Sequence, residues 1–237
     1  MPEHVIAPPT LAELPIAGSR QRFPVRRIFC IARNYASHAR EMGMDAERAA
    51  PVHFMKPRES LAQDGAAIVF PPCTELLHHE VELVAALGAG GAEVPVDEAL
   101  DLVFGYAVGN DLTRRDVQAR LRKKGFPWEA AKAFDGAAPI GAIAPASRVG
   151  HPTHGRIRLA VNGKLRQDGN LAEMIWKTAE IVSHLSRWQQ LYPGDLIMTG
   201  TPAGVGPLAP GDRVRCEIEG IGTLTHDIVT LSKEARS

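Results

Sequence analysis

The stretch Leu77–Gly88, "LHHEVELVAALG", has the alternation of a β-strand and carries an unusual pair of acidic residues. Side chains of a strand point alternately to its two faces, so Glu80 and Glu82 share a face, with Cα atoms about 6.5–7 Å apart. The other face and both flanks are apolar. Like charges so close raise each other's pKa unless a positive group lies between them. The stretch therefore fits either the solvent-facing side of an edge strand or a site for a hard cation such as Mg²⁺, Mn²⁺ or Ca²⁺.

The overall composition excludes several classes of partner. The 237 residues include 27 basic and 27 acidic ones, so the formal net charge is zero, whereas nucleic-acid binders usually carry a basic excess. No apolar run approaches the roughly 20 residues of a membrane span, and the N-terminus has no signal-peptide pattern. Three scattered cysteines without metal-type spacing suggest reduced thiols. We expect a soluble, cytoplasmic protein that binds neither nucleic acid nor membranes.

The order of strand-like and helix-like segments predicts an α+β protein that is mostly β. Residues 1–24 carry five prolines and no clear period, which indicates an N-terminal arm, and residues 25–237 contain no linker, which indicates a single domain. Short β-type runs punctuated by Gly and Pro dominate this domain. The tetrapeptide "VNGK" (Val161–Lys164) predicts a hairpin with a type I′ turn.

Three segments have helical patterns. One helix is predicted to begin at Thr113, with Asp116 completing its cap, and to stop at Gly125. A longer amphipathic helix is predicted over 170–191, opening at Asn170. A short helix is predicted over 34–43.

Two further sets of residues have the chemistry of a site. Asp111 ends a strand just before a helix, where a third carboxylate can join Glu80 and Glu82, although an ordinary helix-approach Asp has the same position. His38 and Glu41 lie three residues apart on the short predicted helix, where a carboxylate supports an imidazole as a general base. A surface His–Glu pair is the alternative.

A Gly-rich segment and three long polar side chains complete the candidates. "TGTPAGVG" (Thr199–Gly206) follows an apolar strand, so its backbone N–H groups and the hydroxyls of Thr199 and Thr201 can hold an anion. It lacks the Lys-Ser/Thr of a P-loop. Arg115 and Gln118 share a helix face, and Lys132 is a further candidate. A plain turn and a solvated charged surface explain the same residues equally well.

Taken together, these stretches resemble one family, that of fumarylacetoacetate hydrolase. The resemblance covers roughly residues 25–228 and rests on an ordered set of stretches: "ARNYASHAREMG", "PVHFMKP", "LHHEVEL", "GYAVGNDLTRRDVQ", "PWEAAKAFDGAAP", "VNGKLRQDG" and "GDLIMTGTPAGVG". It implies a mixed β-sandwich roll and a homodimer.

The resemblance also implies roles for individual residues. Positions matching Glu80, Glu82 and Asp111 hold Mg²⁺ or Mn²⁺, and a dyad matching His38 and Glu41 activates water. Positions that bind substrate or the developing oxyanion match Arg115, Gln118, Lys132 and Thr201. Ala32 departs from the Gly usual in this subgroup.

The subgroup that the chain resembles most hydrolyses fumarylpyruvate to fumarate and pyruvate in the gentisate pathway. The implied activity is therefore metal-dependent cleavage of a C–C bond in a 1,3-diketo acid, with Arg33 and Arg40 as candidates to meet the second carboxylate of the substrate. Acylpyruvase or oxaloacetate decarboxylase activity is the alternative. A metal-dependent ligand binder without turnover is a third possibility, which an intact His38–Glu41 pair argues against.

Overall fold

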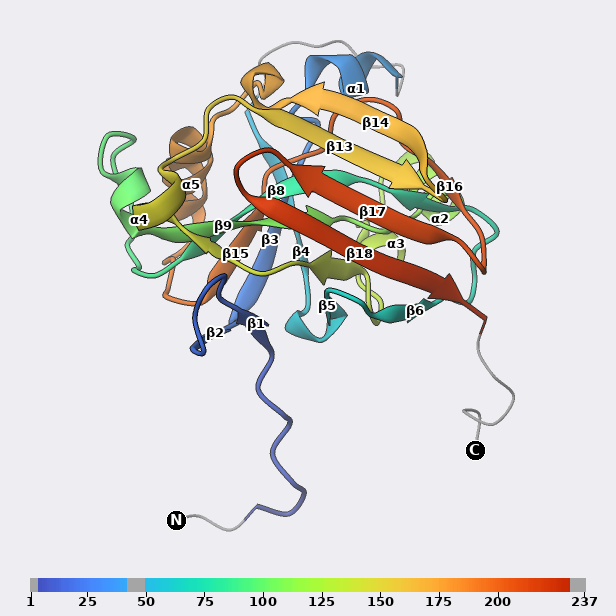
Figure 1. Ribbon diagram of the computed structural model, residues 1–237, viewed down its shortest axis with the longest axis horizontal. Coiled ribbons are helices and arrows are strands. Elements are labelled where there is room, and N and C mark those ends of the chain that lie inside the picture. The colour runs from blue at the N-terminus through green and yellow to red at the C-terminus, as the bar shows by residue number, and fades with distance from the viewer. Residues whose placement is uncertain (1–3, 42–49, 231–237) are drawn as a thin grey trace.

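Two packed β-sheets form the body of the protein (Figure 1). The structure is a computed structural model that describes residues 4–41 and 50–230, except for the side chains of residues 38–40. The eight-stranded sheet contains, in spatial order, β4 (Val52–Lys56), β3 (Arg27–Ala32), β15 (Asp195–Met198), β8 (Val81–Leu87), β9 (Val103–Asn110), β11 (Ala138–Ile140) and β5 (Leu61–Gln63), and β12 (Ala144–Pro145) also pairs with β9. The five-stranded sheet contains β14 (Lys164–Asn170), β13 (Arg156–Val161), β17 (Arg213–Ile218), β18 (Gly222–Val229) and β6 (Ala67–Val69).

The two sheets pack face to face. In β13 and β17 buried and more exposed residues alternate, so one face of the smaller sheet is buried. That face meets the larger sheet where β13 contacts β8 and where β17 and β18 contact β9. Each sheet contains both parallel and antiparallel pairs. The predicted mixed β-sandwich of an α+β, mostly β protein is confirmed.

The stretch that opens the sequence analysis is not one strand, as predicted, but two. β7 (Leu77–His79) lies between β10 (Thr113–Arg114) and β16 (Gly206–Leu208) in a three-stranded sheet, whereas β8 lies inside the larger sheet. The chain changes sheets at Glu80. The break arises because β10 and β16 pair with β7 and no strand of the larger sheet does.

The helices differ from the predictions mainly at their starts. They are α1 (Ala36–Glu41), α2 (Arg115–Lys123), α3 (Glu129–Lys132), α4 (Ala146–Val149) and α5 (Thr178–Trp188), with 3₁₀ turns η1 (Arg58–Ser60), η2 (Ala99–Leu102) and η3 (Leu171–Glu173). Thr113 does not cap α2, because pairing with His78 holds it in β10. Asp116 instead accepts hydrogen bonds from the Thr74 hydroxyl and from Glu75 N–H.

The long helix predicted over 170–191 is also wrong in part. Asn170 caps only η3, where its side chain accepts from Ala172 N–H, and the α-helix begins eight residues later at Thr178. The Glu180 carboxylate accepts from Lys177 N–H at 2.9 Å and so satisfies a donor at this second start. The short helix is present as α1, but its predicted terminator, Gly43, lies outside the described residues.

The turn at Asn162 is a confirmed prediction, with φ of 51° there and 76° at Gly163, as a type I′ hairpin requires. The first residues hold more structure than an arm suggests: β1 (Glu13–Pro15) and β2 (Arg22–Pro24) form a hairpin that buries Leu14 and Phe23 in the core. The division of the chain into an arm (1–24) and one domain (25–237) stays a prediction.

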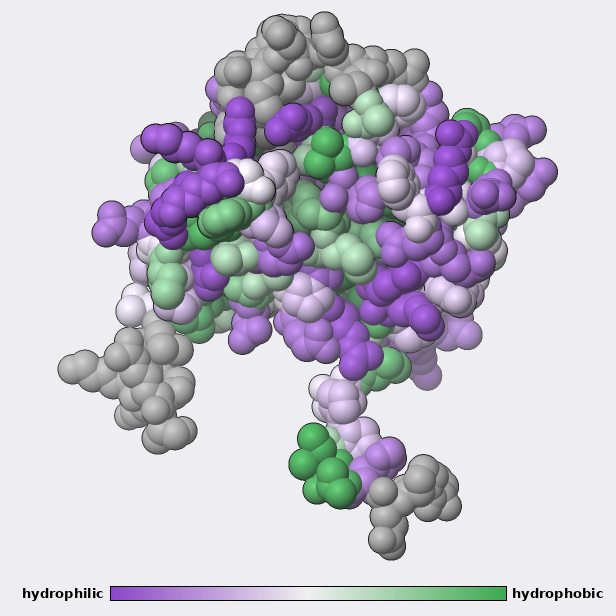
Figure 2. Space-filling view, turned by 180° about the vertical axis from the view of Figure 1, so that it is seen from behind, coloured by the Kyte–Doolittle hydropathy of each residue, from purple (hydrophilic) through white to green (hydrophobic). Residues whose placement is uncertain are grey.

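The surface seen from behind mixes polar and apolar residues. In Figure 2, hydrophilic residues cover much of the rim of this face and hydrophobic residues gather towards its centre. Within the described part of the chain, no helix is long and apolar enough to cross a membrane.

Candidate active site

Glu80 lies at the break between β7 and β8, and side-chain amides replace the missing strand partner there. Glu80 N–H donates to the Asn110 side-chain oxygen at 2.7 Å, and Val81 N–H donates to the Gln167 side-chain oxygen at 3.1 Å. Glu80 and Glu82 are 5% and 2% exposed, and β8 has β15 and β9 as neighbours. The edge-strand interpretation of the acidic pair is therefore wrong.

Asp111 joins the two glutamates because of the register between β8 and β9. Val81 is paired with Asn110, the last residue of β9, and Asp111 N–H donates to the Glu80 carbonyl at 2.8 Å. One ligand atom from each of Glu80, Glu82 and Asp111 lies within 4.8 Å of the others, and all three side chains are buried. The predicted carboxylate triad thus forms at the ends of two adjacent strands: Glu82 lies in β8, Glu80 directly precedes it, and Asp111 directly follows β9.

Three cations surround this triad. Lys132, the last residue of α3, lies 2.8 Å from Glu80 Oε2 and 2.6 Å from Asp111 Oδ2, and Arg115 is paired with the other oxygen of Glu80. Burial disfavours the Lys132 ammonium, but Asp111 and Glu80 outweigh burial and raise the pKa of Lys132 above its usual value. The Lys132 side chain is therefore a charged ammonium.

Lys56, the third cation, holds the backbone around the triad. Its buried ammonium donates to the carbonyls of Leu112, Lys132 and Ala137 at 2.6–3.1 Å, which uses all three of its N–H bonds. Its 2.9 Å approach to Asp111 Oδ1 is therefore an electrostatic contact, and this oxygen has no hydrogen-bond donor among the described residues. A buried carboxylate oxygen with free lone pairs is a suitable metal ligand.

Glu82 differs from its neighbours because it makes no ion pair with any described residue. Its carboxylate accepts one hydrogen bond, from Gly200 N–H at 2.7 Å. Gly200 has a φ of +99°, and a Cβ there would lie 2.7 Å from that of Asn34, so this position requires glycine. Burial, followed by the charges of Asp111 and Glu80, raises the pKa of Glu82 well above its ordinary value. The charge of Lys132 opposes this rise without cancelling it, and a divalent cation would provide the missing positive charge.

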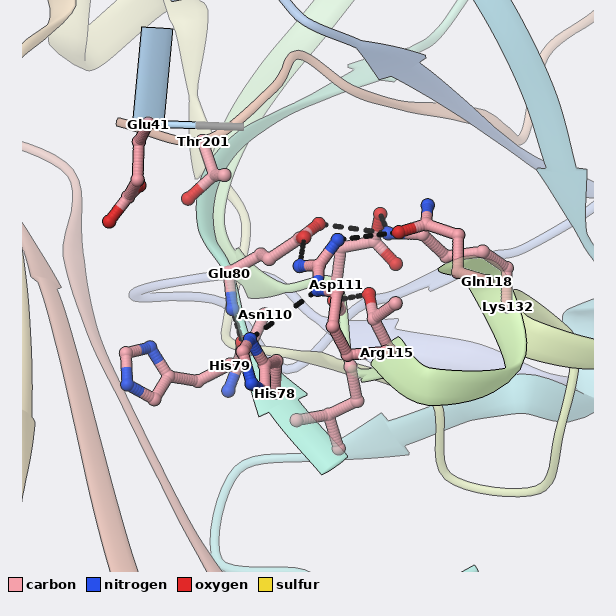
Figure 3. A network of polar contacts seen from close by, with 12 residues as sticks. Glu41, His78, His79, Glu80, Asn110, Asp111, Arg115, Gln118, Lys132 and Thr201 are labelled. Atoms are coloured by element: carbon pink, nitrogen blue, oxygen red, sulfur yellow. Dashed lines mark hydrogen bonds and ion pairs between the residues drawn. The ribbon is translucent and has the colours of Figure 1, made fainter. Parts of the chain in front are cut away.

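Most predicted site residues line a single cavity above the triad. Its walls include Arg33, Arg115, Gln118, Lys132 and Thr201 together with the three carboxylates. Arg115 donates to Gln118 at 2.6 Å, so the two share a helix face as expected. In Figure 3, Thr201 and Glu41 lie on one side of Glu80, and Gln118 and Lys132 lie on the other.

The other predicted site residues either do not line the cavity or have side chains outside the described part of the structure. The side chains of His38 and Arg40 lie outside the described structure, so the His38–Glu41 dyad stays a prediction. Glu41 is exposed at the end of α1, and its carboxylate accepts from Gly204 N–H at 3.2 Å. Thr199 donates its hydroxyl proton to the Leu83 carbonyl at 2.9 Å, away from the cavity.

Sequence reasoning missed several residues of the site. Phe54, Arg122 and Trp128 line the cavity, and Ala32 lies there beside Arg33. Lys56 and Gln167 lie beneath it, fully buried. A sequence offers no signal for a buried lysine on a strand, although Lys56 lies in "PVHFMKP", one of the stretches that carry the resemblance described above.

The fold and the site define an enzyme with a β-sandwich frame and a buried metal-type carboxylate triad beneath a cationic cavity. The sequence profile of the fumarylacetoacetate hydrolase C-terminal region matches residues 27–229. A fumarylpyruvate hydrolase from Pseudomonas aeruginosa, solved with Mn²⁺ and pyruvate, is 48% identical, with a TM-score of 0.95 over 97% of this chain and 100% of that one. Human mitochondrial oxaloacetate tautomerase FAHD1 is 41% identical over 86% of this chain and 91% of its own. The Arabidopsis thaliana protein of the same name is 40% identical over 85% and 90%. The chain belongs to the fumarylacetoacetate hydrolase family.

Proposed function

We propose that this protein is a Mg²⁺- or Mn²⁺-dependent hydrolase that cleaves fumarylpyruvate to fumarate and pyruvate, a reaction of the gentisate pathway. The observation that carries the proposal is the full-length similarity to a fumarylpyruvate hydrolase that binds Mn²⁺ and pyruvate. The triad supports it, because three buried carboxylates within 4.8 Å of one another form an oxygen-donor set for such an ion.

The residues around the triad fit the steps of C–C bond hydrolysis. A divalent ion held by the triad supplies Lewis-acid stabilisation of negative charge on the substrate oxygens. His38, oriented by Glu41, takes a proton from the water that attacks the carbonyl distal to the pyruvate end. The Lys132 ammonium neutralises the tetrahedral oxyanion, whose collapse breaks the C–C bond and releases pyruvate as its enolate. Thr201 binds the pyruvate carboxylate.

Two arginines support a substrate with a second carboxylate. Arg33 and Arg122 both line the cavity, and neither guanidinium makes a hydrogen bond or ion pair with a described residue. Burial, followed by the charge of Arg122, lowers the pKa of Arg33. An anionic group of a ligand relieves this repulsion. Fumarylpyruvate has a carboxylate at its far end, whereas acetylpyruvate has a methyl group there.

The second candidate function is oxaloacetate tautomerisation or decarboxylation, which the 40–41% identical relatives named oxaloacetate tautomerase favour. These reactions need the triad and a proton-transfer group but no attacking water. The test is kcat/KM for fumarylpyruvate, acetylpyruvate and oxaloacetate with one metal-loaded preparation. A charge-assisted hydrogen bond of about 1.5–3 kcal/mol predicts a roughly 10–150-fold preference for fumarylpyruvate over acetylpyruvate. Equal values would favour a general acylpyruvase, and oxaloacetate as best substrate would favour the second candidate.

We also propose a homodimer. β4 is an edge strand of the larger sheet, and its Val52 and Met55 are 45% and 37% exposed. Trp188, 71% exposed, lies beside it, with its ring centroid 6.3 Å from that of His53. An exposed edge with adjoining apolar side chains suits a second copy. Sedimentation at micromolar concentration is expected to give twice the chain mass, and a monomer would contradict the proposal.

For the location we propose the cytoplasm. Cys30, Cys73 and Cys216 are all free thiols. Free thiols are typical of reducing compartments.

A further inference from the structure

Gln167 links the strand that carries the carboxylates to the loop that carries Thr201. This residue of β14 is completely buried. Its side-chain oxygen accepts from Val81 N–H at 3.1 Å and from His79 Nδ1 at 3.0 Å. Its side-chain nitrogen donates to Thr201 Oγ1 at 2.8 Å and to the Pro202 carbonyl at 2.9 Å. The amide thus has four partners and no capacity to spare.

Two backbone groups fix the orientation of this amide. Val81 N–H can only donate and the Pro202 carbonyl can only accept, so a flipped amide would place donor against donor and acceptor against acceptor. The amide nitrogen therefore faces Thr201, whose hydroxyl oxygen accepts the bond. The Thr201 proton is left to donate elsewhere, and it donates to none of the described residues. Since Thr201 lines the cavity, this proton is available to a ligand there.

Thr199, two residues earlier in the same loop, shows the opposite arrangement. Its hydroxyl donates to the Leu83 carbonyl at 2.9 Å, so its proton is used within the protein. The loop therefore presents one hydroxyl that supports the sheet and one that is held as a free donor.

We propose that Gln167 is a positioning residue that holds the Thr201 hydroxyl as a hydrogen-bond donor toward the carboxylate of a bound α-keto acid. The inference rests on the proposed function, in which Thr201 binds the pyruvate carboxylate. Because the same amide also accepts from Val81 and His79, on either side of Glu80, it ties the anion-binding hydroxyl to the chain segment that carries the triad.

A double-mutant cycle measured by pyruvate binding tests this role. Pyruvate is titrated calorimetrically into the Mn²⁺-loaded wild type, Thr201→Val, Gln167→Met and the double variant. Losing a hydrogen bond to a charged group raises the pyruvate Kd of Thr201→Val about 10–100-fold, and Gln167→Met is expected to raise it at least about fivefold. If Gln167 acts through Thr201, the double variant matches Thr201→Val within about twofold. Thr199→Val is the matched control and leaves the Kd unchanged.

The outcomes separate this inference from the proposed function. Additive losses in the double variant, or a wild type that does not bind pyruvate, would overturn the inference. Non-additive losses in a protein that does not turn over fumarylpyruvate would support the inference and contradict the function. If Gln167→Met does not fold, Gln167→Glu replaces it in the pyruvate titration. This substitution keeps an acceptor for Val81 N–H and presents an oxygen to Thr201. The Thr201 hydroxyl then donates its proton to the new carboxylate instead of to the ligand, so this variant is also expected to bind pyruvate more weakly. Wild-type affinity for pyruvate would overturn the inference.

Discussion

Replacing Glu82 by Gln tests whether the triad is built for a cation, because Glu82 carries the one triad carboxylate without an ion-pair partner among the described residues. Without metal, the ionised Glu82 carboxylate destabilises the native state. Its pKa is raised, so the native state binds a proton more tightly than the unfolded chain does. Stability therefore falls as pH rises from the ordinary value of 4.5 through the raised pKa. Glu82→Gln removes this fall.

The size of the effect is bounded by the cost of protonating an ordinary carboxyl. At pH 7, 2.5 units above 4.5, that cost is at most about 3.4 kcal/mol, so a gain of about 1–3 kcal/mol is expected for the metal-free variant. This gain corresponds to an increase in Tm of about 2–12 °C. Mutating a residue that hydrogen-bonds to a metal ligand typically weakens metal binding about 10–100-fold. Removing a ligand itself is therefore expected to raise the Mn²⁺ Kd at least about 100-fold.

Calorimetric titration with Mn²⁺ and thermal unfolding with and without chelator measure both effects. Glu98→Gln, at an exposed position outside the cavity lining, is the control. Unchanged Mn²⁺ affinity in Glu82→Gln would place the metal elsewhere. If metal-free Glu82→Gln were less stable than the metal-free wild type, the Glu82 carboxylate would not be destabilising, and the reasoning would be refuted.

Three other substitutions test the remaining parts of the site. His38→Ala is expected to lower fumarylpyruvate turnover about 10²–10⁴-fold and to leave Mn²⁺ affinity and oxaloacetate chemistry less affected; near-normal turnover would remove His38 from the mechanism. Arg33→Met and Arg122→Met are each expected to lower kcat/KM for fumarylpyruvate about 10-fold or more but not that for acetylpyruvate, and equal losses on both substrates would contradict a role at the distal carboxylate. Lys56→Met removes a positive charge beside Asp111 and the donor to three buried carbonyls, so urea unfolding is expected to show a loss of about 3–5 kcal/mol, and a loss below about 1 kcal/mol would show that the contact is dispensable.

The triad could be predicted from sequence because its signal is local. Alternation predicts that Glu80 and Glu82 share a face, and the two carboxylates are close in the structure although Glu80 directly precedes β8 instead of lying within it. The position of Asp111 at a strand end needs only the register of neighbouring strands to complete the site. The hairpin at Asn162 was predictable for the same reason, since its turn chemistry lies in two adjacent residues.

The parts that sequence reasoning missed depend on long-range pairing. The break at Glu80 and the displaced start of α2 both follow from the pairing of β7 with β10. The hydrogen bonds of Gln167 join segments 34 or more residues apart. Capping rules describe what a helix start prefers, but tertiary pairing overrode them at Thr113. Lys56 is a buried cation whose partners are carbonyls, which no side-chain pattern reveals.

Product analysis by proton NMR distinguishes C–C bond hydrolysis from tautomerisation. Fumarylpyruvate is incubated with the Mg²⁺-loaded protein, and with the same protein in the presence of chelator. Equimolar fumarate and pyruvate are expected from the metal-loaded protein, and neither product with chelator. Unchanged fumarylpyruvate, in a preparation that rapidly interconverts the keto and enol forms of oxaloacetate, would contradict the assignment as a C–C hydrolase.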